Sequence, residues 1–372
     1  MAELEQFDGY LKDDGPAALV IREYLMPVEG RDGVVFPATF AAGDGFRGGY
    51  NVDASANGTN VCLIDSVGAQ ANRIEPIFMQ EQYKPFVPQI VVKAGEKDVN
   101  LLEVGHRAGD ALVRCSALQQ TLRDAFHASQ KGDAEPLAKI APTSLVFGVW
   151  DSRDTQEKRP RLVSSTIRAF NVRELKRGAV YIPPVDYASL DVFSEEDKSK
   201  AEGDKKNPLA KRGFVHNPAS ASHGGVIADG GVRRDAILAL AALRLLHAGQ
   251  DRDKTLALRR YVLGLALVAF TYRPGGYLRQ GCLLVLDPEK AEENDFVEVY
   301  SSGKRSPATI SHDAALTYAE IVASKFGVGA DRTEHFEKKL AKDDVKPEGD
   351  GKKGKKAKDK KAEPLSDTEG GA

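Results

Sequence analysis

The chain has 372 residues, of which 42% are hydrophobic and 28% charged, so it can bury the core of one large domain or two ordinary ones. Its formal net charge of −2 excludes a domain that is strongly basic overall, and any phosphate-binding surface must be a local stripe. No apolar run approaches the roughly 18 residues of a membrane helix, and the acidic N-terminal residues do not resemble a signal peptide. We therefore expect a cytoplasmic protein without a membrane partner.

The expected elements mix strands and helices. In chain order, the pattern predicts strands at 17–25 and 61–65, a helix at 69–82, a strand at 90–94, a helix at 110–130, strands at 145–150 and 179–183, helices at 233–247 and 254–270, strands at 277–286 and 296–300, and a helix at 312–325. The spacing of Ile237, Leu240, Ala241 and Leu245 is that of one buried helical face, which is why 233–247 is expected to be helical. Because strands and helices do not alternate as βαβ units, we expect an α+β fold.

Three polar segments interrupt or follow these elements, at 42–60, 194–216 and 338–372. The first two are long enough to be functional insertions into a single domain that covers residues 1–337. The last contains 11 lysines and 8 acidic residues but almost nothing apolar, so we expect a disordered Lys-rich tail. A weak electrostatic tether to nucleic acid is the other role open to such a tail.

The chain lacks the patterns of common catalytic and metal sites. Cys62, Cys115 and Cys282 lie among apolar residues without a CxxC pair, which indicates core thiols and no disulfide or zinc site. GxSxG and HExxH are absent, and SSGKRS lacks the upstream glycine of a phosphate loop. We expect a protein that is not an enzyme and binds no cofactor or metal. The alternative is a metal-independent ribonuclease or hydrolase that uses His223, in an HGG sequence, or His106.

Arginines beside hydroxyl residues are the strongest sign of a binding function. Residues 147–187 contain Arg153, Arg159, Arg161, Arg168, Arg173 and Arg177. Guanidinium groups suit phosphate oxygens, and Ser164 and Ser165 can donate hydrogen bonds to a sugar–phosphate chain. In a strand, Ser164, Thr166 and Arg168 would share one face. Surface ion pairs explain these arginines equally well; the candidate partners are Asp151, Asp154, Glu157 and Glu174.

Two more patches repeat this pattern. Asn72 and Arg73 lie at the start of an expected helix, where amide and N-terminal donors suit an anionic chain. Arg73 pairing with Glu75 or Asp65 is the equal alternative. Arg107 comes just before the next expected helix.

Seven motifs, taken together and in order, resemble one family. They are LIDSVGAQANRIE, GHRAGDALVR, FGVWDSR, RLVSSTIRAFNV, YIPPVDY, HGGVIADGGVRRDAI and GYLRQGC. The chain resembles the CRISPR-associated RAMP backbone subunit of type I-G (formerly I-U) Cascade, the Csb-one variety of the Cas-seven family, from about residue 17 to 281. The Lys-rich tail is not part of this resemblance.

The resemblance implies an RRM-like (ferredoxin-like) palm with inserted finger and thumb segments, and 194–216 is preferred over 42–60 as the thumb. It implies a non-catalytic subunit that binds CRISPR RNA, other copies of itself and other Cascade subunits, and that meets target DNA through the guide. The aromatic surface of ordinary RRM domains is not recognisable, so no stacking aromatic is expected. The residues in matching motifs that are expected to bind RNA are Asn72, Arg73, Arg107, Arg153, Arg161, Ser164, Ser165, Arg168, His223, Gly224, Gly225, Arg233 and Arg234.

Overall fold

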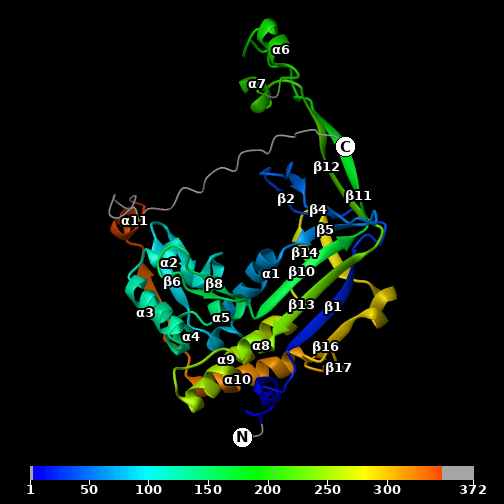
Figure 1. The fold of residues 1–372 in the computed structure, drawn as a ribbon. Helices are drawn as coiled ribbons and strands as arrows, with labels where there is room; N and C mark the ends of the chain where they lie inside the picture. The colour runs from blue at the N-terminus through cyan, green and yellow to red at the C-terminus, as the bar shows by residue number, and fades with distance from the viewer. Residues whose placement is uncertain (1–2, 205, 346–372) are drawn as a thin grey trace, which may run out of the picture.

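The computed structural model describes residues 3–204 and 206–345, which form a mixed α/β fold around a curled antiparallel sheet (Figure 1). The strand order is β14-β15-β1-β13-β10-β5-β4, and β16 pairs with both β1 and β17. The strands are β1 (Ala18–Pro27), β4 (Val52–Ala54), β5 (Asn60–Asp65), β10 (Val163–Phe170), β13 (Val232–Ala239), β14 (Tyr277–Arg279), β15 (Cys282–Leu286), β16 (Asp295–Val299) and β17 (Arg305–Pro307).

The helix expected at 233–247 is wrong, because its first half is the central strand β13. Arg234, Ala236 and Leu238 are buried, whereas Arg233 and Asp235 between them are only partly buried, which is the two-residue period of a strand. β13 pairs with β1 on one side and β10 on the other, so the backbone hydrogen bonds of the sheet override a weak helical spacing. Within the expected range, the structure has a helix only at α8 (Leu240–Leu243), directly after β13.

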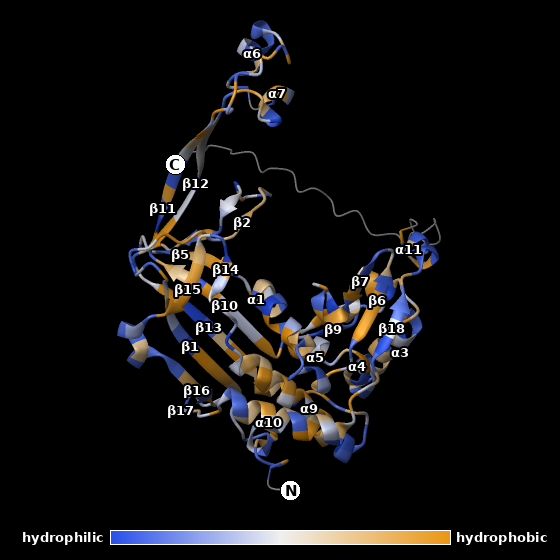
Figure 2. Ribbon diagram, turned by 180° about the vertical axis from the view of Figure 1, so that it is seen from behind, coloured by the Kyte–Doolittle hydropathy of each residue, from blue (hydrophilic) through white to orange (hydrophobic). Residues whose placement is uncertain are grey.

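Helices cover one face of this sheet. The long helix α9 (Arg252–Thr271) is capped by the Asp251 side chain and is buried on all sides between residues 261 and 270. It packs against α10 (His312–Phe326) so closely that a Cβ on Gly264 would lie 2.6 Å from Val322 Cγ2. The same face carries α1 (Val67–Ile74) and α5 (Thr143–Phe147) against β10. Hydrophobic residues concentrate in the sheet and in α9 (Figure 2).

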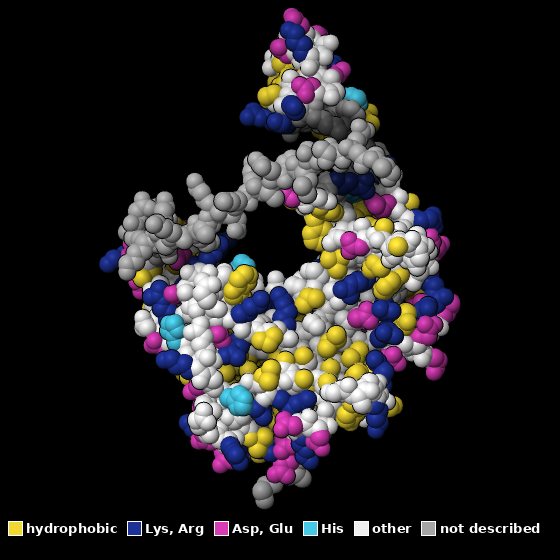
Figure 3. Space-filling model, viewed as in Figure 1, with side chains coloured by type: hydrophobic (Ala, Val, Ile, Leu, Met, Phe, Trp, Pro, Cys, Tyr) yellow, Lys and Arg dark blue, Asp and Glu magenta, His cyan; other side chains and the backbone are white. Residues whose placement is uncertain are grey.

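A second lobe lies across from the sheet (Figure 1), and the space-filling view shows a hollow between the two (Figure 3). It contains a small sheet of β18 (Arg332–His335), β6 (Ile90–Ala94) and β7 (Lys97–Asn100), the hairpin β8 (Val149–Trp150) and β9 (Lys158–Arg159), and the helices α2 (Ala111–Arg114), α3 (Gln119–Gln130) and α4 (Glu135–Ile140). Short 3-10 turns connect these elements: η2 (Glu75–Met79), η3 (Lys84–Phe86), η4 (Leu101–Glu103) and η5 (Arg107–Gly109). The helix expected at 110–130 is thus two helices, and the strand expected at 145–150 is the end of α5 followed by β8.

A long two-stranded arm extends β10 and β13 away from the body (Figure 1). It consists of β11 (Val172–Tyr181) and β12 (Asn217–Ala228), and its tip carries α6 (Glu195–Ala201) and α7 (Pro208–Lys211). The polar segment 194–216 is therefore the tip of this arm. The other polar segment, 42–60, forms β3 (Gly49–Tyr50) and β4 near the base of the arm and follows β2 (Thr39–Phe40). The remaining turns are η1 (Asp8–Leu11) and η6 (Pro288–Glu293).

Three further predictions concern the cysteines, the Lys-rich tail and membrane helices. All three cysteines are free and buried, as expected, and burial raises the pKa of Cys62 to about 12 and that of Cys282 to about 11. Residues 338–344, expected in the tail, form α11 (Lys338–Asp344), while residues 346–372 lie outside the described chain. Within the described chain, no helix has the length and apolarity that a membrane span requires.

Candidate nucleic-acid interface

A basic cleft of about 770 Å³ opens in the second lobe, between η5 and the β8–β9 hairpin. Its basic lining residues are Arg107, Arg114, Arg153, Lys158, Arg159 and Arg161, and its acidic lining residue is Asp344. We call this set the basic cleft. Lys and Arg side chains also gather along the floor of the hollow around the position of α1 and α5 in Figure 3. This concentration of positive charge occurs on a chain whose net charge is negative, as a phosphate-binding stripe requires.

Half of these cations are already neutralised inside the protein. Arg107 Nε lies 2.6 Å from Glu75, Arg114 Nη2 lies 2.7 Å from Asp344, and Arg159 Nε lies 2.5 Å from Glu157. These pairs position the walls of the cleft.

The other three cations, Arg153, Lys158 and Arg161, are exposed. None of the three makes a hydrogen bond or an ion pair with another residue of the described chain. The ion pairs considered for Arg153 and Arg161 in the sequence analysis are therefore not formed. Cations without an ion-pair partner remain available to an anionic ligand.

The one tryptophan of the chain stands in this cleft. Trp150 is 60% exposed, and Lys158 Nζ lies 5.3 Å from the centre of its ring. An exposed indole presents a large, rigid apolar surface on which a ligand can gain free energy by packing. Aromatic rings beside cations are the standard platform for stacking the bases of a single strand. The cleft thus offers both a surface for bases and charges for phosphates.

The shape of the cleft follows from local backbone features. Gly148 ends α5 at a φ of 79°, and a Cβ there would lie 2.9 Å from Arg161 Cγ, so only glycine lets the two segments approach. In the β8–β9 loop, the buried Asp151 carboxylate accepts hydrogen bonds of 2.8 Å from both the backbone N–H and the hydroxyl of Thr155. These contacts hold Trp150 and Lys158 on neighbouring strands of the hairpin.

Helix α1 connects the basic cleft with the sheet. The Ser66 side chain caps it, and the exposed Asn72 lies beside Gly105, a residue of the cleft wall. Arg73 points to the other side, where its guanidinium lies 3.1 Å from Asp65 and donates to the Leu278 carbonyl at 2.8 Å. Of the two partners considered for Arg73, the structure selects Asp65. Both residues lie near the end of α1 and not at its start, so the expectation that they stand beside helix N-terminal donors is wrong. They lie between the cleft and the sheet.

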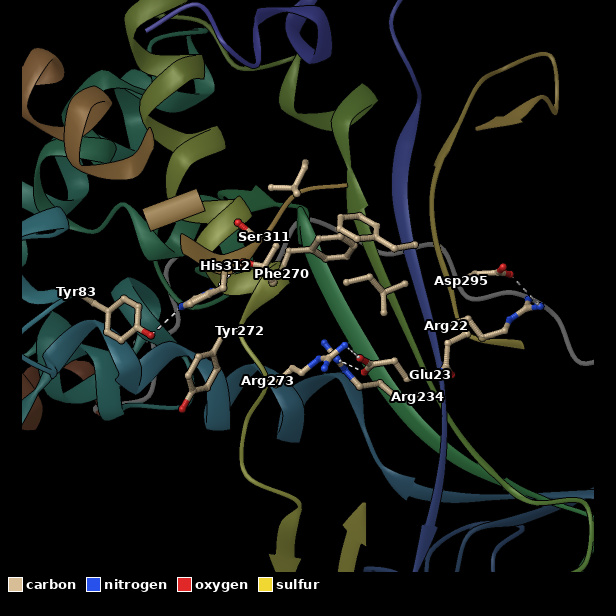
Figure 4. Close-up of a pocket in the computed structure, with 15 residues that line it drawn as sticks. Arg22, Glu23, Tyr83, Arg234, Phe270, Tyr272, Arg273, Asp295, Ser311 and His312 are labelled. Carbon is tan, nitrogen blue, oxygen red and sulfur yellow. Dashed lines mark hydrogen bonds and ion pairs between the residues drawn. The ribbon is translucent and has the colours of Figure 1, made fainter. Parts of the chain in front are cut away.

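The expected residues Ser165 and Arg234 are inside the protein rather than on its surface. The Ser165 hydroxyl donates to Gln70 and accepts from Arg234, and Arg234 pairs with Glu23, whose second oxygen lies 3.0 Å from Arg273 (Figure 4). Arg234 is 5% exposed. These two residues therefore organise the sheet interior, and Arg273 is the member of the network that reaches solvent.

The network borders a second cavity of about 590 Å³ (Figure 4). His312 lies in its wall with both ring nitrogens occupied, since Nε2 is 2.9 Å from the Tyr83 hydroxyl and Nδ1 is 2.9 Å from the Thr271 hydroxyl. Burial lowers the pKa of His312. A neutral imidazole with a hydrogen bond at each nitrogen fixes the start of α10 and is not free to bind a ligand.

The expected residues Ser164, Arg168 and Arg233 lie on the opposite face of the sheet, which we call the open face. As predicted, Ser164 and Arg168 share a face of β10 and Ser165 lies on the other. Arg233 Nε lies 3.0 Å from Asp235 and its guanidinium lies over Phe170, while Arg168 donates to Thr166. The arginines of this face are therefore engaged with neighbouring side chains.

The HGG sequence of His223, Gly224 and Gly225 lies at the base of the arm, away from the basic cleft and from the arginines of the open face. The ring of His223 packs 4.8 Å from that of Tyr50, and the Gly225 N–H donates to the Tyr50 hydroxyl at 3.0 Å. A Cβ on Gly224 would lie 2.8 Å from the Leu175 backbone, so this glycine allows the two arm strands to meet. The role that the structure gives these three residues is to join the segment 42–60 to the arm.

Trp150, Lys158 and Arg273 were not predicted from the sequence. The first two had a signal, because the single tryptophan of the chain lies three residues before Arg153 in FGVWDSR. Arg273 had none, since its position beside Glu23 depends on pairing between distant segments. Among the described residues, no three His, Cys, Asp or Glu side chains gather in a way that could hold a metal ion.

Comparison with known proteins adds one finding. Residues 19–174 match the family model described as CRISPR-associated protein GSU0053. The matched segment runs from β1 through α1 and the basic cleft to the start of β11. The match supports a CRISPR-associated protein. No curated protein matches the chain.

Proposed function

We propose that the chain is a non-catalytic RNA-binding subunit of a type I-G Cascade complex, which assembles along the CRISPR RNA and presents it for pairing with target DNA. The observation that carries this proposal is the basic cleft, which is lined by an exposed tryptophan and by three cations without an ion pair in the described chain. Its position inside the segment that matches a CRISPR-associated family supports an RNA ligand. Contacts to phosphates and stacking of bases are independent of sequence, which suits a protein that must accept any guide.

The strand order supports an RRM-like palm. The four palm strands come along the chain in the order β1, β10, β13 and β16. Helices lie between the first two and between the last two, which is a β-α-β-β-α-β order. In the sheet they lie as β10-β13-β1-β16, with every neighbouring pair antiparallel. The arm then interrupts the hairpin between the second and third strands of this palm.

The arm is our candidate for the thumb. Its strands continue β10 and β13 beyond the body, and its tip is the segment 194–216 that the resemblance favours (Figure 1). Val180, Tyr181 and Ile182 near the tip are 57%, 47% and 72% exposed, which is a large apolar surface for a projecting strand. We assign this surface to contact with the next copy of the subunit along the RNA.

Binding to RNAs of increasing length tests the assembly. The proposal predicts that purified protein forms complexes whose mass rises in whole subunits with RNA length, and that affinity falls steeply with added salt. Mass photometry or analytical ultracentrifugation reads the stoichiometry. A monomer that stays free of RNA at every length would contradict the proposal.

A metal-independent ribonuclease is the second candidate, and one observation favours it. His106 lines the basic cleft with Nδ1 3.6 Å from Asp110, whereas the His223 ring is packed against Tyr50. Incubation of labelled RNA with pure protein in EDTA tests this function. Cleavage that disappears in His106→Ala would establish the nuclease, and intact RNA would support the non-catalytic subunit.

A further inference from the structure

The floor of the basic cleft contains an ion pair that is poorly satisfied. Glu75 and Arg107 are 1% and 3% exposed, and Arg107 Nε lies 2.6 Å from a Glu75 carboxylate oxygen without hydrogen-bond geometry. The backbone of Arg107 adopts a φ of 53°, a left-handed conformation that is costly for arginine. The placement of this guanidinium at the floor of the cleft therefore requires a strained backbone conformation.

Unpartnered polar atoms concentrate around this pair. Of the eight buried side-chain nitrogen and oxygen atoms that lack a hydrogen-bond partner in the described chain, five belong to Glu75, Arg107, Arg114 and Asp151. Arg107 and Arg114 line the cleft, Glu75 contacts Arg107, and Asp151 lies 4.0 Å from Arg114. Two of these atoms belong to Arg107: Nε, which lies in the ion pair with Glu75, and Nη2. A buried polar atom left without a hydrogen bond costs about 1–3 kcal/mol. The concentration of such atoms at this place indicates a ligand that satisfies them.

The charges at this place are also unbalanced. Arg161 lies close enough for its positive charge to be felt by both members of the pair, and burial together with repulsion from Arg107 lowers the pKa of Arg161. Two guanidinium groups thus lie within electrostatic reach of one carboxylate, Glu75, which forms its ion pair with Arg107. The missing negative charge is one that an anion entering the cleft would supply.

We propose that the floor of the basic cleft is a seat for one phosphate group, held by Arg107 and Arg161, in which Glu75 serves as the internal counter-ion that the phosphate replaces. This deepens the proposed function, on which it rests, by assigning the seat to a backbone phosphodiester of the bound RNA. Bidentate guanidinium groups match the phosphate oxygens, and Trp150 in the same cleft is available to the adjacent base. Glu75 competes with the ligand and so limits the affinity of the cleft.

The competing role of Glu75 gives an unusual expectation, that removal of a buried carboxylate strengthens RNA binding. We expect Glu75→Gln to tighten binding of a single-stranded RNA about fivefold, because the two arginines lose their internal counter-ion. Glu23→Gln is the matched control, since Glu23 is also buried and pairs with the buried Arg234, and neither residue lines the basic cleft. Removal of the same charge at Glu23 should leave affinity within about twofold.

A double-mutant cycle locates the effect. Arg161→Ala should weaken RNA binding about tenfold and reduce the slope of log affinity against log salt by about 0.7, the value for one lost phosphate contact to a single strand. In the Arg161→Ala background, Glu75→Gln should give little gain. Equal effects of Glu75→Gln and Glu23→Gln, or no effect of either, would overturn the seat while the RNA-binding function stands.

Two further measurements keep the outcomes distinct. Thermal melting establishes whether Glu75→Gln folds. If it does not, two variants of the exposed Arg161 decide. RNA affinity that is lost in Arg161→Ala and partly restored in Arg161→Lys supports the seat, and unchanged affinity in both overturns it. If the wild-type protein binds no RNA, the proposed function fails. Calorimetry with inorganic pyrophosphate then decides the seat, which is supported by binding that Arg161→Ala abolishes and overturned by its absence.

Discussion

The basic cleft and the open face of the sheet use arginine in opposite ways. On the open face, Arg233 pairs with Asp235 and lies over Phe170, and Arg168 donates to its own strand. In the cleft, Arg153 and Arg161 have no such partner in the described chain. The first arrangement satisfies the charges within the protein, and the second leaves them for a ligand.

This difference teaches that the number of arginines does not identify a binding surface. The open face also carries aromatic rings, since Lys290 lies over Tyr24 there as Arg233 lies over Phe170. It is therefore a fair competitor, with the same residue types as the cleft. What separates the two is whether the guanidinium groups have side-chain partners and how far the aromatic ring is exposed. Trp150 is exposed whereas Tyr24 and Phe170 are partly buried, so both features favour the cleft.

Charge reversal is expected to break the comparison most strongly. The triple variant Arg153→Glu, Lys158→Glu and Arg161→Glu should lower RNA affinity at least about 100-fold, because three phosphate contacts become repulsions. The open-face variant Arg168→Ala with Arg233→Ala should stay within about threefold of wild type. Fluorescence anisotropy with one labelled RNA at fixed salt measures both. Equal losses would show that the two faces contribute alike.

Trp150 is expected to have the next largest effect. Trp150→Ala should weaken RNA binding about tenfold, since stacking on an aromatic ring contributes about 1–3 kcal/mol per base. Trp150→Phe should retain most of the affinity, and Phe170→Ala on the open face is the matched control. Because the Trp150 ring is exposed, thermal stability should barely change. Undiminished binding in Trp150→Ala would exclude stacking at this position.

The wall of the cleft gives a prediction about stability. Gly148→Ala should lower the free energy of unfolding by about 1–3 kcal/mol, because φ is 79° and the new Cβ meets the Arg159 and Arg161 backbone at 3.1 Å. Gly178→Ala, which has open space at its Cβ, should change stability far less. Chemical denaturation measures both. A neutral Gly148→Ala would mean that the approach of these segments is not tightly constrained.

A dependence on pH is the smallest expected effect. Burial raises the pKa of Glu75 from 4.5 to about 7, against the opposing pull of Arg107 and Arg161. The associated stability is fully present below pH 4.5 and is lost as pH rises through about 7. A protonated Glu75 no longer competes with phosphate for the arginines. RNA binding should therefore strengthen by a few-fold at most as the pH falls from 8 to 6, and Glu75→Gln should flatten this change. A pH profile that Glu75→Gln leaves unaltered would assign it to another group.

Local patterns predicted much of the fold but not its pairing. The helices α9 and α10 and the strands β1 and β6 lie within a few residues of their expected bounds, because their periodicity is strong and local. β13 was assigned as a helix because its strand character depends on the two neighbours that it pairs with in the sheet. Such neighbours are far away in the sequence.

The candidate site was predicted in part for the same reason. Motifs identified Arg153 and Arg161, and the structure brings both into one cleft with Arg107. The same motifs also contain Ser165 and Arg234, which the structure places in a buried network. A motif shows that a segment resembles a family, but which side of a strand faces solvent is decided by packing, so surface and interior residues were expected together.

Photo-cross-linking of bound single-stranded RNA, followed by mass spectrometry of the modified peptides, tests the central claim most directly. If the basic cleft is the RNA-binding surface, cross-links will fall on Trp150 and on the peptide that spans residues 148–161, and the triple charge-reversal variant will lose them. Cross-links on Tyr24 or Phe170 of the open face, with none at Trp150, would contradict the account.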